Sequence, residues 1–150
     1  MRADLYLDTS ALVKLYVAEP ETERLAAYVT RQPGPLPYTS LHELELTHAL
    51  ERRAADGDLP RPDVARICAL IEKDLADGTL FRPEFAWESA FASAIHLVRQ
   101  HKNLRSLDSL HLGYALGMKC TKFVTFDQRQ ARVAIAEKLL LWPRRAPFQI

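Results

Sequence analysis

The chain has 150 residues and a mass of 17.1 kDa, which suits one domain, 1–150, with a single core. Its 20 basic and 19 acidic residues give a formal charge of +1, which excludes proteins that bind nucleic acid by bulk charge alone. A hydrophobic content of 48% excludes a disordered chain, and the apolar runs all fall short of the ~20 residues that span a bilayer.

Short apolar runs alternate with helix-spaced apolar stripes along the sequence. The expected strands cover, in order, residues 5–7, 36–39, 80–81, 122–126 and 139–142, where the run at 80–81 is either a strand or a loop. The expected helices cover, in order, residues 9–17, 20–31, 40–55, 62–76, 86–99, 106–118 and 128–137. This alternation predicts an α/β fold with a central, mostly parallel sheet of about five short strands covered by helices.

Three of these helices begin at residues that commonly stabilise helix N-termini. Pro20 falls in the first turn of the second helix, where its missing N–H removes no hydrogen bond. Ser40 and Glu43 have the spacing of a capping box, so we expect Ser40 at the N-cap of the third helix. Ser106 is expected to cap the sixth helix.

Charge is distributed unevenly along the chain. Residues 1–58 contain 10 acidic and 6 basic residues, whereas residues 118–150 contain 2 acidic and 7 basic ones. Either the charges scatter over an ordinary solvated surface, or acids gather at a site with basic residues around them. The positions of the acids relative to the predicted strands bear on this choice.

Three aspartates follow predicted strands or open the helices after them. Asp8 directly follows the first strand, Asp127 directly follows the fourth, and Asp108 lies in the first turn of the sixth helix. In an open parallel sheet the carboxyl ends of the strands share one edge, where ligand crevices form. Each aspartate also has a purely structural explanation as a capping or first-turn acid, worth ~1 kcal/mol. Together they predict a group of carboxylates at one edge of the sheet.

A glutamate of the third helix completes this group, and the choice lies between Glu43 and Glu45. Residues two apart on a helix differ by about 200° in direction, so both cannot face one crevice. Glu43 already has a capping role with Ser40, whereas Glu45 lies among leucines, where an acid needs a partner. We therefore assign Glu45 to the site and leave open whether Glu43 contributes.

Carboxylates that share a crevice repel one another, and a hard divalent cation removes that repulsion. Mg²⁺ takes oxygen ligands, keeps several waters and accepts phosphate oxygens from a substrate. One or two such ions can activate water and stabilise the leaving oxygen in phosphodiester cleavage. The sequence has no Gly-rich phosphate loop and no Gly-x-Ser-x-Gly nucleophile elbow that would offer a competing chemistry.

The histidines and cysteines form no recognisable metal site in the sequence. His42 and His48 are six residues apart without a cysteine or third histidine to join them. His111 is expected to be a packed or partly exposed helix residue. Cys68 and Cys120 lie far apart and show no disulfide pattern, which, with the lack of a signal-like apolar start, predicts a cytoplasmic protein.

Four short blocks of sequence, in this order, resemble the PIN domain family and, within it, the VapC-type toxins of toxin–antitoxin pairs. The blocks are 7–14 (LDTSALVK), Ser40 with 45–50 (ELTHAL), 107–112 (LDSLHL) and 124–127 (VTFD). The likeness extends from about residue 4 to about residue 142. It implies a three-layer α/β/α fold and a Mg²⁺- or Mn²⁺-dependent endoribonuclease that cleaves RNA phosphodiester bonds.

By position, the resemblance implies a set of acidic metal-site residues, namely Asp8, Glu45, Asp108 and Asp127. It also implies hydrogen-bonding supports, namely Ser10, Thr9 and Thr125. It further implies a toxin homodimer and a VapB-type antitoxin that fills the crevice, joins the toxin in a hetero-oligomer and supplies the contact with operator DNA. Two alternatives remain: a PIN nuclease of RNA processing without an antitoxin, and a PIN-like module that binds RNA or a protein without catalysis.

Two features depart from the family pattern. Gly113 stands where an alanine is more usual, which predicts a looser helix without loss of a ligand. The tail at 143–150 has no counterpart and is either a basic RNA-contacting extension or an ordered strand with a polar end. Candidates for RNA phosphate contacts, each also explicable as an ordinary surface residue, are Lys14, Arg52, Arg53, Arg105, Arg129 and Arg132.

Overall fold

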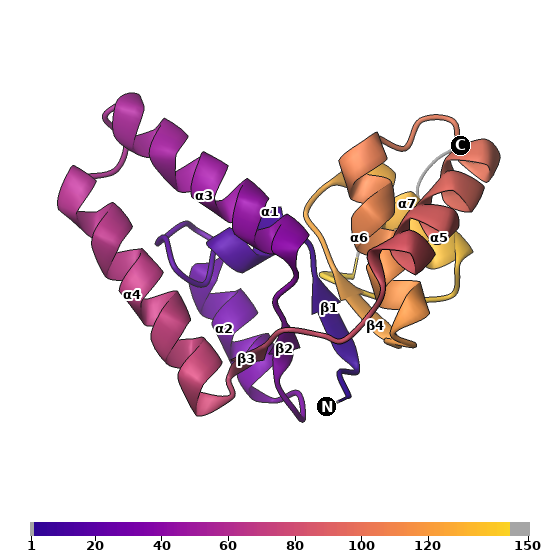
Figure 1. The fold of residues 1–150 in the computed structure, drawn as a ribbon, viewed down its shortest axis with the longest axis horizontal. Helices are drawn as coiled ribbons and strands as arrows, with labels where there is room; N and C mark the ends of the chain where they lie inside the picture. Colours follow the sequence, from indigo (N-terminus) through magenta and orange to yellow (C-terminus); the bar gives the residue numbers. More distant parts are fainter. Residues whose placement is uncertain (1, 145–150) are drawn as a thin grey trace.

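Among residues 2–144, five short strands form the centre of the fold, and helices pack on both sides of them (Figure 1). The computed structural model describes residues 2–144, so most of the predicted extension at 143–150 lies outside the described residues. The strands are β1 (Leu5–Leu7), β2 (Leu36–Pro37), β3 (Leu80–Phe81), β4 (Lys122–Val124) and β5 (Leu140–Trp142). The helices are α1 (Thr9–Val13), α2 (Thr22–Thr30), α3 (Ser40–Ala55), α4 (Arg61–Asp77), α5 (Trp87–Gln100), α6 (Ser106–Gly117) and α7 (Gln128–Ala136). The predicted order of elements is confirmed, and residues 80–81 form a strand.

All strand pairings are parallel, as the alternation of strands and helices predicts. β4 pairs with β1 on one side, where Val124 lies opposite Leu7, and with β5 on the other, where Phe123 lies opposite Leu141. β2 pairs with β3, and β1 adjoins β2, which gives the spatial order β3-β2-β1-β4-β5. Hydrogen bonds join the first two strands of this order and the last three separately, a division that the sequence pattern does not show.

Alternating side chains of β1 and β4 divide the core into two halves. Tyr6 and Phe123 face the side on which α5, α6 and α7 pack. Leu5, Leu7 and Val124 face the opposite side, which α1 to α4 cover. Because successive strand residues point to opposite faces, this alternation produces the predicted three-layer α/β/α arrangement. Figure 1 shows the two groups of helices on either side of β1 and β4.

The first two helices are shorter than the sequence predicts. α1 ends at Val13 rather than at residue 17, and the Lys14 carbonyl accepts a hydrogen bond from the Thr22 hydroxyl at 2.7 Å. α2 begins at Thr22, so Pro20 precedes this helix instead of lying in its first turn. The Thr22 hydroxyl thus links the residue after α1 to the start of α2.

The N-cap of α3 is Thr39, and the prediction of Ser40 was wrong. The Thr39 backbone is extended, and its hydroxyl accepts a hydrogen bond from the His42 N–H at 3.2 Å. The Thr39 N–H donates to His42 Nδ1 at 3.0 Å, so a histidine takes the place that the predicted capping box gives to Glu43. Glu43 instead forms an ion pair with Arg82 at 2.8 Å.

β4 is two residues shorter than predicted because the chain turns at Thr125. The Thr125 hydroxyl accepts a hydrogen bond from the Asp127 N–H at 3.0 Å. Asp127 then caps α7 by accepting a hydrogen bond from the Gln130 N–H at 2.9 Å. Residues 38–39 leave β2 where the chain turns into α3, and β5 begins one residue later than predicted, at Leu140.

Both cysteines are free thiols, as the sequence pattern predicts. Cys68 is exposed on α4, whereas Cys120 is buried, and burial raises the pKa of its thiol to about 12. Within residues 2–144, no helix combines the length and the apolar character needed to cross a membrane.

Two glycines let α6 pack closely against its neighbours. A Cβ at Gly113 would lie 2.7 Å from the Ala90 carbonyl oxygen of α5, well inside van der Waals contact. A Cβ at Gly117 would overlap the ring of Phe85. The prediction that Gly113 loosens the helix was therefore wrong, because the missing side chain lets the backbone of α5 approach.

We expect Gly113→Ala to destabilise the fold. Alanine is the better helix former by ~1 kcal/mol, so helix propensity alone predicts stabilisation. The contact with the Ala90 carbonyl predicts the reverse, a loss of about 1–3 kcal/mol of unfolding free energy through overpacking. Urea unfolding followed by circular dichroism measures the difference, and an unfolding free energy at or above the wild-type value would contradict this close approach.

Candidate active site

Asp8 lies at the end of β1 as the N-cap of α1, and its side chain is almost fully buried. Its Oδ1 accepts hydrogen bonds from the Ala11 N–H at 2.8 Å and the Ser10 hydroxyl at 2.9 Å. Its Oδ2 accepts one from the Thr125 hydroxyl at 2.5 Å. Burial raises the pKa of Asp8, and these donors oppose part of the rise. The carboxylate is thus held in one orientation and keeps an oxygen lone pair for a ligand.

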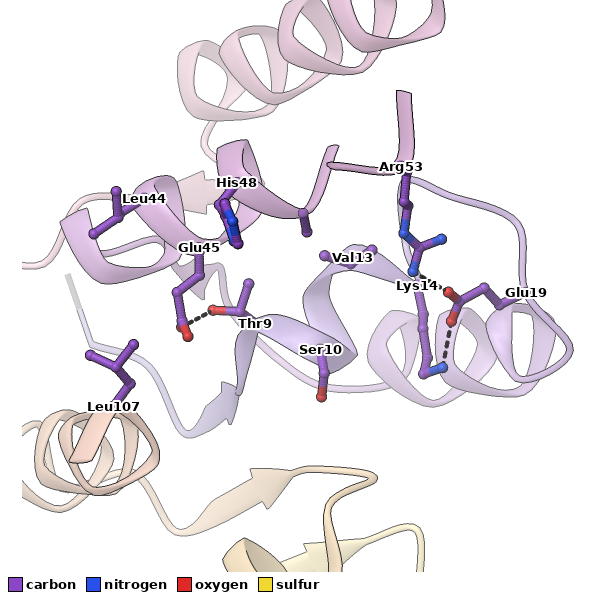
Figure 2. A pocket seen from close by; sticks show the side chains of 11 residues that line it. Thr9, Ser10, Val13, Lys14, Glu19, Leu44, Glu45, His48, Arg53 and Leu107 are labelled. Atoms are coloured by element: carbon purple, nitrogen blue, oxygen red, sulfur yellow. Dashed lines mark hydrogen bonds and ion pairs between the residues drawn. The ribbon is translucent and has the colours of Figure 1, made fainter. Parts of the chain in front are cut away.

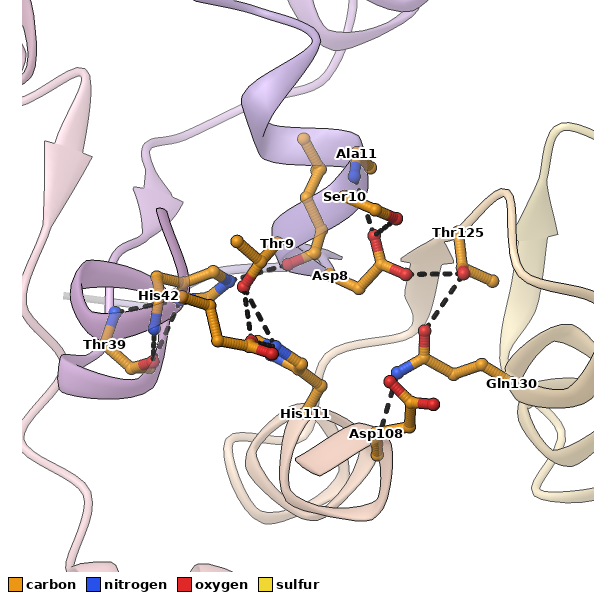
Figure 3. Close-up of polar contacts among 12 residues, drawn as sticks. Asp8, Thr9, Ser10, Ala11, Thr39, His42, Asp108, His111, Thr125 and Gln130 are labelled. Atoms are coloured by element: carbon orange, nitrogen blue, oxygen red, sulfur yellow. Dashed lines mark hydrogen bonds and ion pairs between the residues drawn. The ribbon is translucent and has the colours of Figure 1, made fainter. Parts of the chain in front are cut away.

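A buried glutamine connects Asp8 with Asp108 (Figure 3). The Thr125 hydroxyl that donates to Asp8 also lies 3.0 Å from Gln130 Oε1. Gln130 Nε2 donates to the Asp108 carbonyl oxygen at 3.2 Å. Asp127 belongs to the same network, because its N–H donates to the Thr125 hydroxyl. These bonds tie the ends of β1 and β4 to the starts of α6 and α7, so the three aspartates lie at one edge of the sheet.

Glu45 reaches this edge from α3. The Thr9 hydroxyl donates to Glu45 Oε1 at 2.7 Å, and His111 Nε2 lies 2.5 Å from the same oxygen. Burial alone would raise the pKa of Glu45, but these two contacts bring it below its usual value. The structure therefore places Glu45 beside Thr9, the neighbour of Asp8, while Glu43 lies exposed with its arginine partner.

The sequence predictions missed His111 and Gln130. His111 is packed, one of the two alternatives that the sequence left open, but its contacts with the site were not anticipated: its Nδ1 lies 2.7 Å from the Tyr6 hydroxyl. Its spacing of three residues from Asp108 places both on one face of α6, and this was a usable signal. Gln130 stands three residues after Asp127, the spacing of a capping box, although its side chain turns to Thr125 instead.

His42 is a structural residue. Its Nε2–H donates to the Leu7 carbonyl at 2.8 Å, and its Nδ1 accepts from Thr39. Burial, with a smaller contribution from the nearby His111, lowers the pKa of His42 to about 3, so the ring stays neutral. His42 therefore joins α3 to the strand that ends at Asp8.

The pKa of Asp108 is affected by the other carboxylates of the site. Its pKa is raised to about 6, first by burial and then by the charges of Asp127, Asp8 and Glu45. Charges influence one another in this way only at short range or across a region of low dielectric. The four predicted carboxylates therefore form one electrostatic group.

A pocket of about 600 Å³ opens beside Glu45, Thr9 and Ser10 (Figure 2). Its apolar walls come from α1, α3 and α6, and they are Val13, Leu44, Ala49 and Leu107. Leu44 and Leu107 are exposed although both are large and apolar. The pocket gives a second molecule direct access to the side of Glu45.

Ion pairs among Lys14, Glu19 and Arg53 line the part of this pocket away from Glu45. Lys14 lies 2.5 Å from Glu19 and 3.2 Å from Glu21, and Arg53 lies 2.6 Å from Glu19. Figure 2 shows the three side chains Lys14, Glu19 and Arg53 together. Because carboxylates already balance its charge, Lys14 is a weaker candidate for a phosphate contact than the sequence suggests.

The other predicted basic residues lie on the surface. Arg52 is exposed, with Asp56 at 3.9 Å. Arg105 is exposed at the N-cap of α6, the position predicted for Ser106. Arg129 is exposed in the first turn of α7. It lines a second pocket of about 220 Å³ whose other residues are His101, Lys102, Asn103, Leu104, Arg132 and Val133.

The carboxylates suit a hard cation that keeps part of its hydration. Within the described range 2–144, no three His, Cys, Asp or Glu side chains form a ready ligand set around one point. Mg²⁺ binds through one or two carboxylates together with waters and substrate phosphates. Oxygen donors that repel one another are the ligands that a hard divalent cation takes.

Comparison with known proteins agrees with this geometry. A model of the PIN domain family matches residues 5–136, a range that contains all four carboxylates. The chain belongs to this family. It is 33% identical over 130 residues to ribonuclease VapC47 of Mycobacterium tuberculosis, which covers 83% of this chain and 85% of that protein. It is 31% identical over 140 residues to ribonuclease VapC46 of the same organism, which covers 88% and 91%.

Solved structures share the PIN fold at lower identity. VapC20 of Mycobacterium tuberculosis, a toxin that cleaves the sarcin–ricin loop, aligns with a TM-score of 0.65 at 12% identity over 85% of this chain and 93% of that one. A toxin–antitoxin complex from Klebsiella pneumoniae aligns with a TM-score of 0.61 at 13% identity over 97% and 99%. VapBC2 of Rickettsia felis, bound to a fragment of its promoter DNA, also gives 0.61, at 14% identity over 91% and 96%. The predicted α/β/α PIN architecture is confirmed.

For this PIN domain in EDTA, we expect Asp108→Asn to raise the unfolding free energy at pH 7 by about 1–2 kcal/mol, after allowance for partial exposure. A carboxyl with a raised pKa stabilises the fold fully below its unfolded value of 3.8, and that contribution is lost as pH rises through about 6. The gain should therefore be much smaller at pH 4 than at pH 7. Denaturant unfolding from pH 4 to 8 measures it, with Asp58→Asn in the exposed turn after α3 as the control. A difference in unfolding free energy that does not change with pH would contradict the repulsion between Asp108 and the other carboxylates.

Proposed function

We propose that this PIN domain is a metal-dependent endoribonuclease and the toxin component of a type II toxin–antitoxin pair. The observation that carries the proposal is the group of four carboxylates, whose burial and mutual repulsion raise the pKa of Asp108 to about 6. Such a group destabilises a fold unless a cation is bound to it. Relatives named ribonucleases, at 31–33% identity over most of the chain, support the same activity.

Mg²⁺ or Mn²⁺ is the cofactor that we propose, bound among Asp8, Asp108, Asp127 and Glu45 through one or two carboxylates together with waters. A divalent cation in this position supplies Lewis acidity that activates a water and positive charge that stabilises the leaving oxygen of a phosphodiester. Ser10, Thr125 and the Ala11 N–H hold Asp8 in one orientation. Gln130 keeps the start of α6, and with it Asp108, against the same edge. The protein thus contributes fixed oxygen ligands, which is the preorganisation that such sites need.

The partner that we propose is a VapB-type antitoxin, with this chain as a homodimer in the complex. Solved structures with this fold include toxin–antitoxin complexes, one of them bound to promoter DNA. Exposed apolar side chains at a pocket mark interaction sites, and Leu44 and Leu107 lie at the pocket beside Glu45. A partner segment in that pocket would exclude RNA from the carboxylates, and contacts with operator DNA would belong to the antitoxin.

We expect Asp8→Asn and Glu45→Gln to lower RNA cleavage by about 100-fold or more while the fold is kept. Each replacement removes a negative charge from the cation site with little change in shape. Cleavage of total RNA in the presence of Mg²⁺, and again in EDTA, measures the loss. Mapping the wild-type cleavage sites in the same RNA identifies the target.

Glu43→Gln is the matched control for Glu45→Gln. Glu43 lies on the same helix but pairs with Arg82 on the surface, so its replacement should leave cleavage unchanged. Cleavage by wild-type protein that persists in EDTA would contradict the metal-dependent mechanism. Full cleavage by a folded Asp8→Asn protein would contradict the site itself, and absent cleavage with intact RNA binding would favour the non-catalytic PIN module.

Arg129 is the basic residue that we propose for an RNA phosphate, because it lies two residues from Asp127 in a pocket that also holds Lys102 and Arg132. Arg129→Ala should raise KM several-fold with little change in kcat, and should lower the salt dependence of RNA binding by about one ion. Fluorescence anisotropy with the Asp8→Asn protein at several salt concentrations measures the slope. Arg66→Ala on α4 is the control, and an unchanged slope for Arg129→Ala would contradict the contact.

A further inference from the structure

Glu45 is held differently from the other three site carboxylates. Asp8 and Asp127 are N-caps and Asp108 lies in a first helical turn, so their short side chains stay near fixed backbone. Glu45 lies in the second turn of α3, and three side-chain torsions separate its carboxylate from the backbone. Its direction must therefore be set by neighbouring side chains.

Thr9 and His111 set that direction, and both contact the same carboxylate oxygen. The Thr9 hydroxyl donates to Oε1 at 2.7 Å, and His111 Nε2 lies 2.5 Å from it. A carboxylate oxygen accepts hydrogen bonds, so we assign the proton between Glu45 and His111 to Nε2. Oε2 is then the oxygen that remains for a cation or a water.

The tautomer of His111 is fixed from the other side of its ring. Nδ1 lies 2.7 Å from the Tyr6 hydroxyl, which carries an O–H that can donate to it. We assign that proton as donated to Nδ1, which leaves the ring proton on Nε2, facing Glu45. Figure 3 shows the His111 ring beside Thr9.

The residues behind this contact are packed and rigid. Tyr6 is fully buried in β1, and its ring stacks on Phe123 at 5.7 Å with an interplanar angle of 3°. His111 is 1% exposed, and its ring lies 4.9 Å from the ring of His42. Side chains locked in this way hold a metal ligand more firmly than mobile ones do. The buried rings of Tyr6 and His111 thereby connect β1 with the carboxylate of Glu45.

We propose that His111 is a positioning residue of the site, whose Nε2–H fixes Oε1 of Glu45 and leaves Oε2 available to the cation. The inference rests on the proposed ribonuclease function and adds a residue that reaches the cation site through its contact with Glu45. Tyr6 holds the tautomer that this role requires. Nothing in the role depends on a change of charge at His111.

His111→Leu removes the donor, whereas His111→Gln keeps one at a similar distance from the backbone. We expect His111→Leu to lower kcat and Mn²⁺ affinity by about 10–100-fold, the usual effect of losing the partner of a metal ligand, and His111→Gln to recover most of both. Steady-state RNA cleavage gives kcat, and calorimetric titration with MnCl₂ gives affinity without RNA. His96→Leu, on the exposed face of α5, is the matched control and should keep wild-type values.

A double variant separates positioning from general loss of packing. If His111 acts through Glu45, the E45Q/H111L protein should bind Mn²⁺ no more weakly than E45Q alone. A further tenfold loss in the double variant, or wild-type Mn²⁺ affinity in H111L, would overturn the proposal. If H111L fails to fold, Tyr6→Phe provides the test, because it deletes only the hydroxyl that contacts His111. Tyr6→Phe should also weaken Mn²⁺ binding. Unchanged Mn²⁺ affinity in Tyr6→Phe would overturn the role of His111.

The wild-type protein distinguishes this inference from the function on which it rests. Wild-type protein that neither cleaves RNA nor binds Mn²⁺ contradicts the proposed function. Wild-type protein that does both, while the His111 and Tyr6 variants match it, contradicts the positioning role alone.

Discussion

The hydrogen bonds on the buried carboxylate of Asp8 are the interaction on which the site depends. Three donors from two chain segments 117 residues apart, around α1 and after β4, meet on this one group. Burial disfavours the charge of Asp8, and the donors offset part of that penalty only if β1 and β4 stay in register. The position of Asp8 therefore depends on the parallel pairing of the two strands, and the group of carboxylates depends on Asp8.

The carboxylates at this edge of the sheet lower the stability of the fold when they are ionised. Asp108 and Asp8 both have raised pKa values, which means that burial and repulsion disfavour their ionised forms in the folded chain. Close packing elsewhere holds the elements that carry them, most visibly where Gly113 lets α6 approach α5. Stability and function thus oppose each other at the carboxylates, as they commonly do in active sites. A cation that neutralises the carboxylates would remove their repulsion and so stabilise the fold.

Sequence patterns anticipated most elements but not the side chains that support the site. Alternation of strands and helices is a local property, and so is the position of an aspartate after a strand; both were predictable. The capping of α3 was assigned to Ser40, because the preference for serine is local, whereas His42 adopts its role through Leu7, 35 residues away. His111 was assigned to packing for the same reason: its partners Tyr6 and Glu45 are distant in the sequence.

The sequence by itself determined the α/β class, the order of the elements, the PIN resemblance and the choice of four carboxylates. The fold class and element order follow from periodicity, the carboxylates from residue types and positions relative to strand ends, and the resemblance from four short sequence blocks; all of these are local. Only the tertiary structure decided how the carboxylates are held: Asp8 by Thr125, the start of α6 by Gln130, and Glu45 by Thr9 and His111. The physical reason is that each of these bonds needs a distance and a direction between separate elements, and packing alone fixes those.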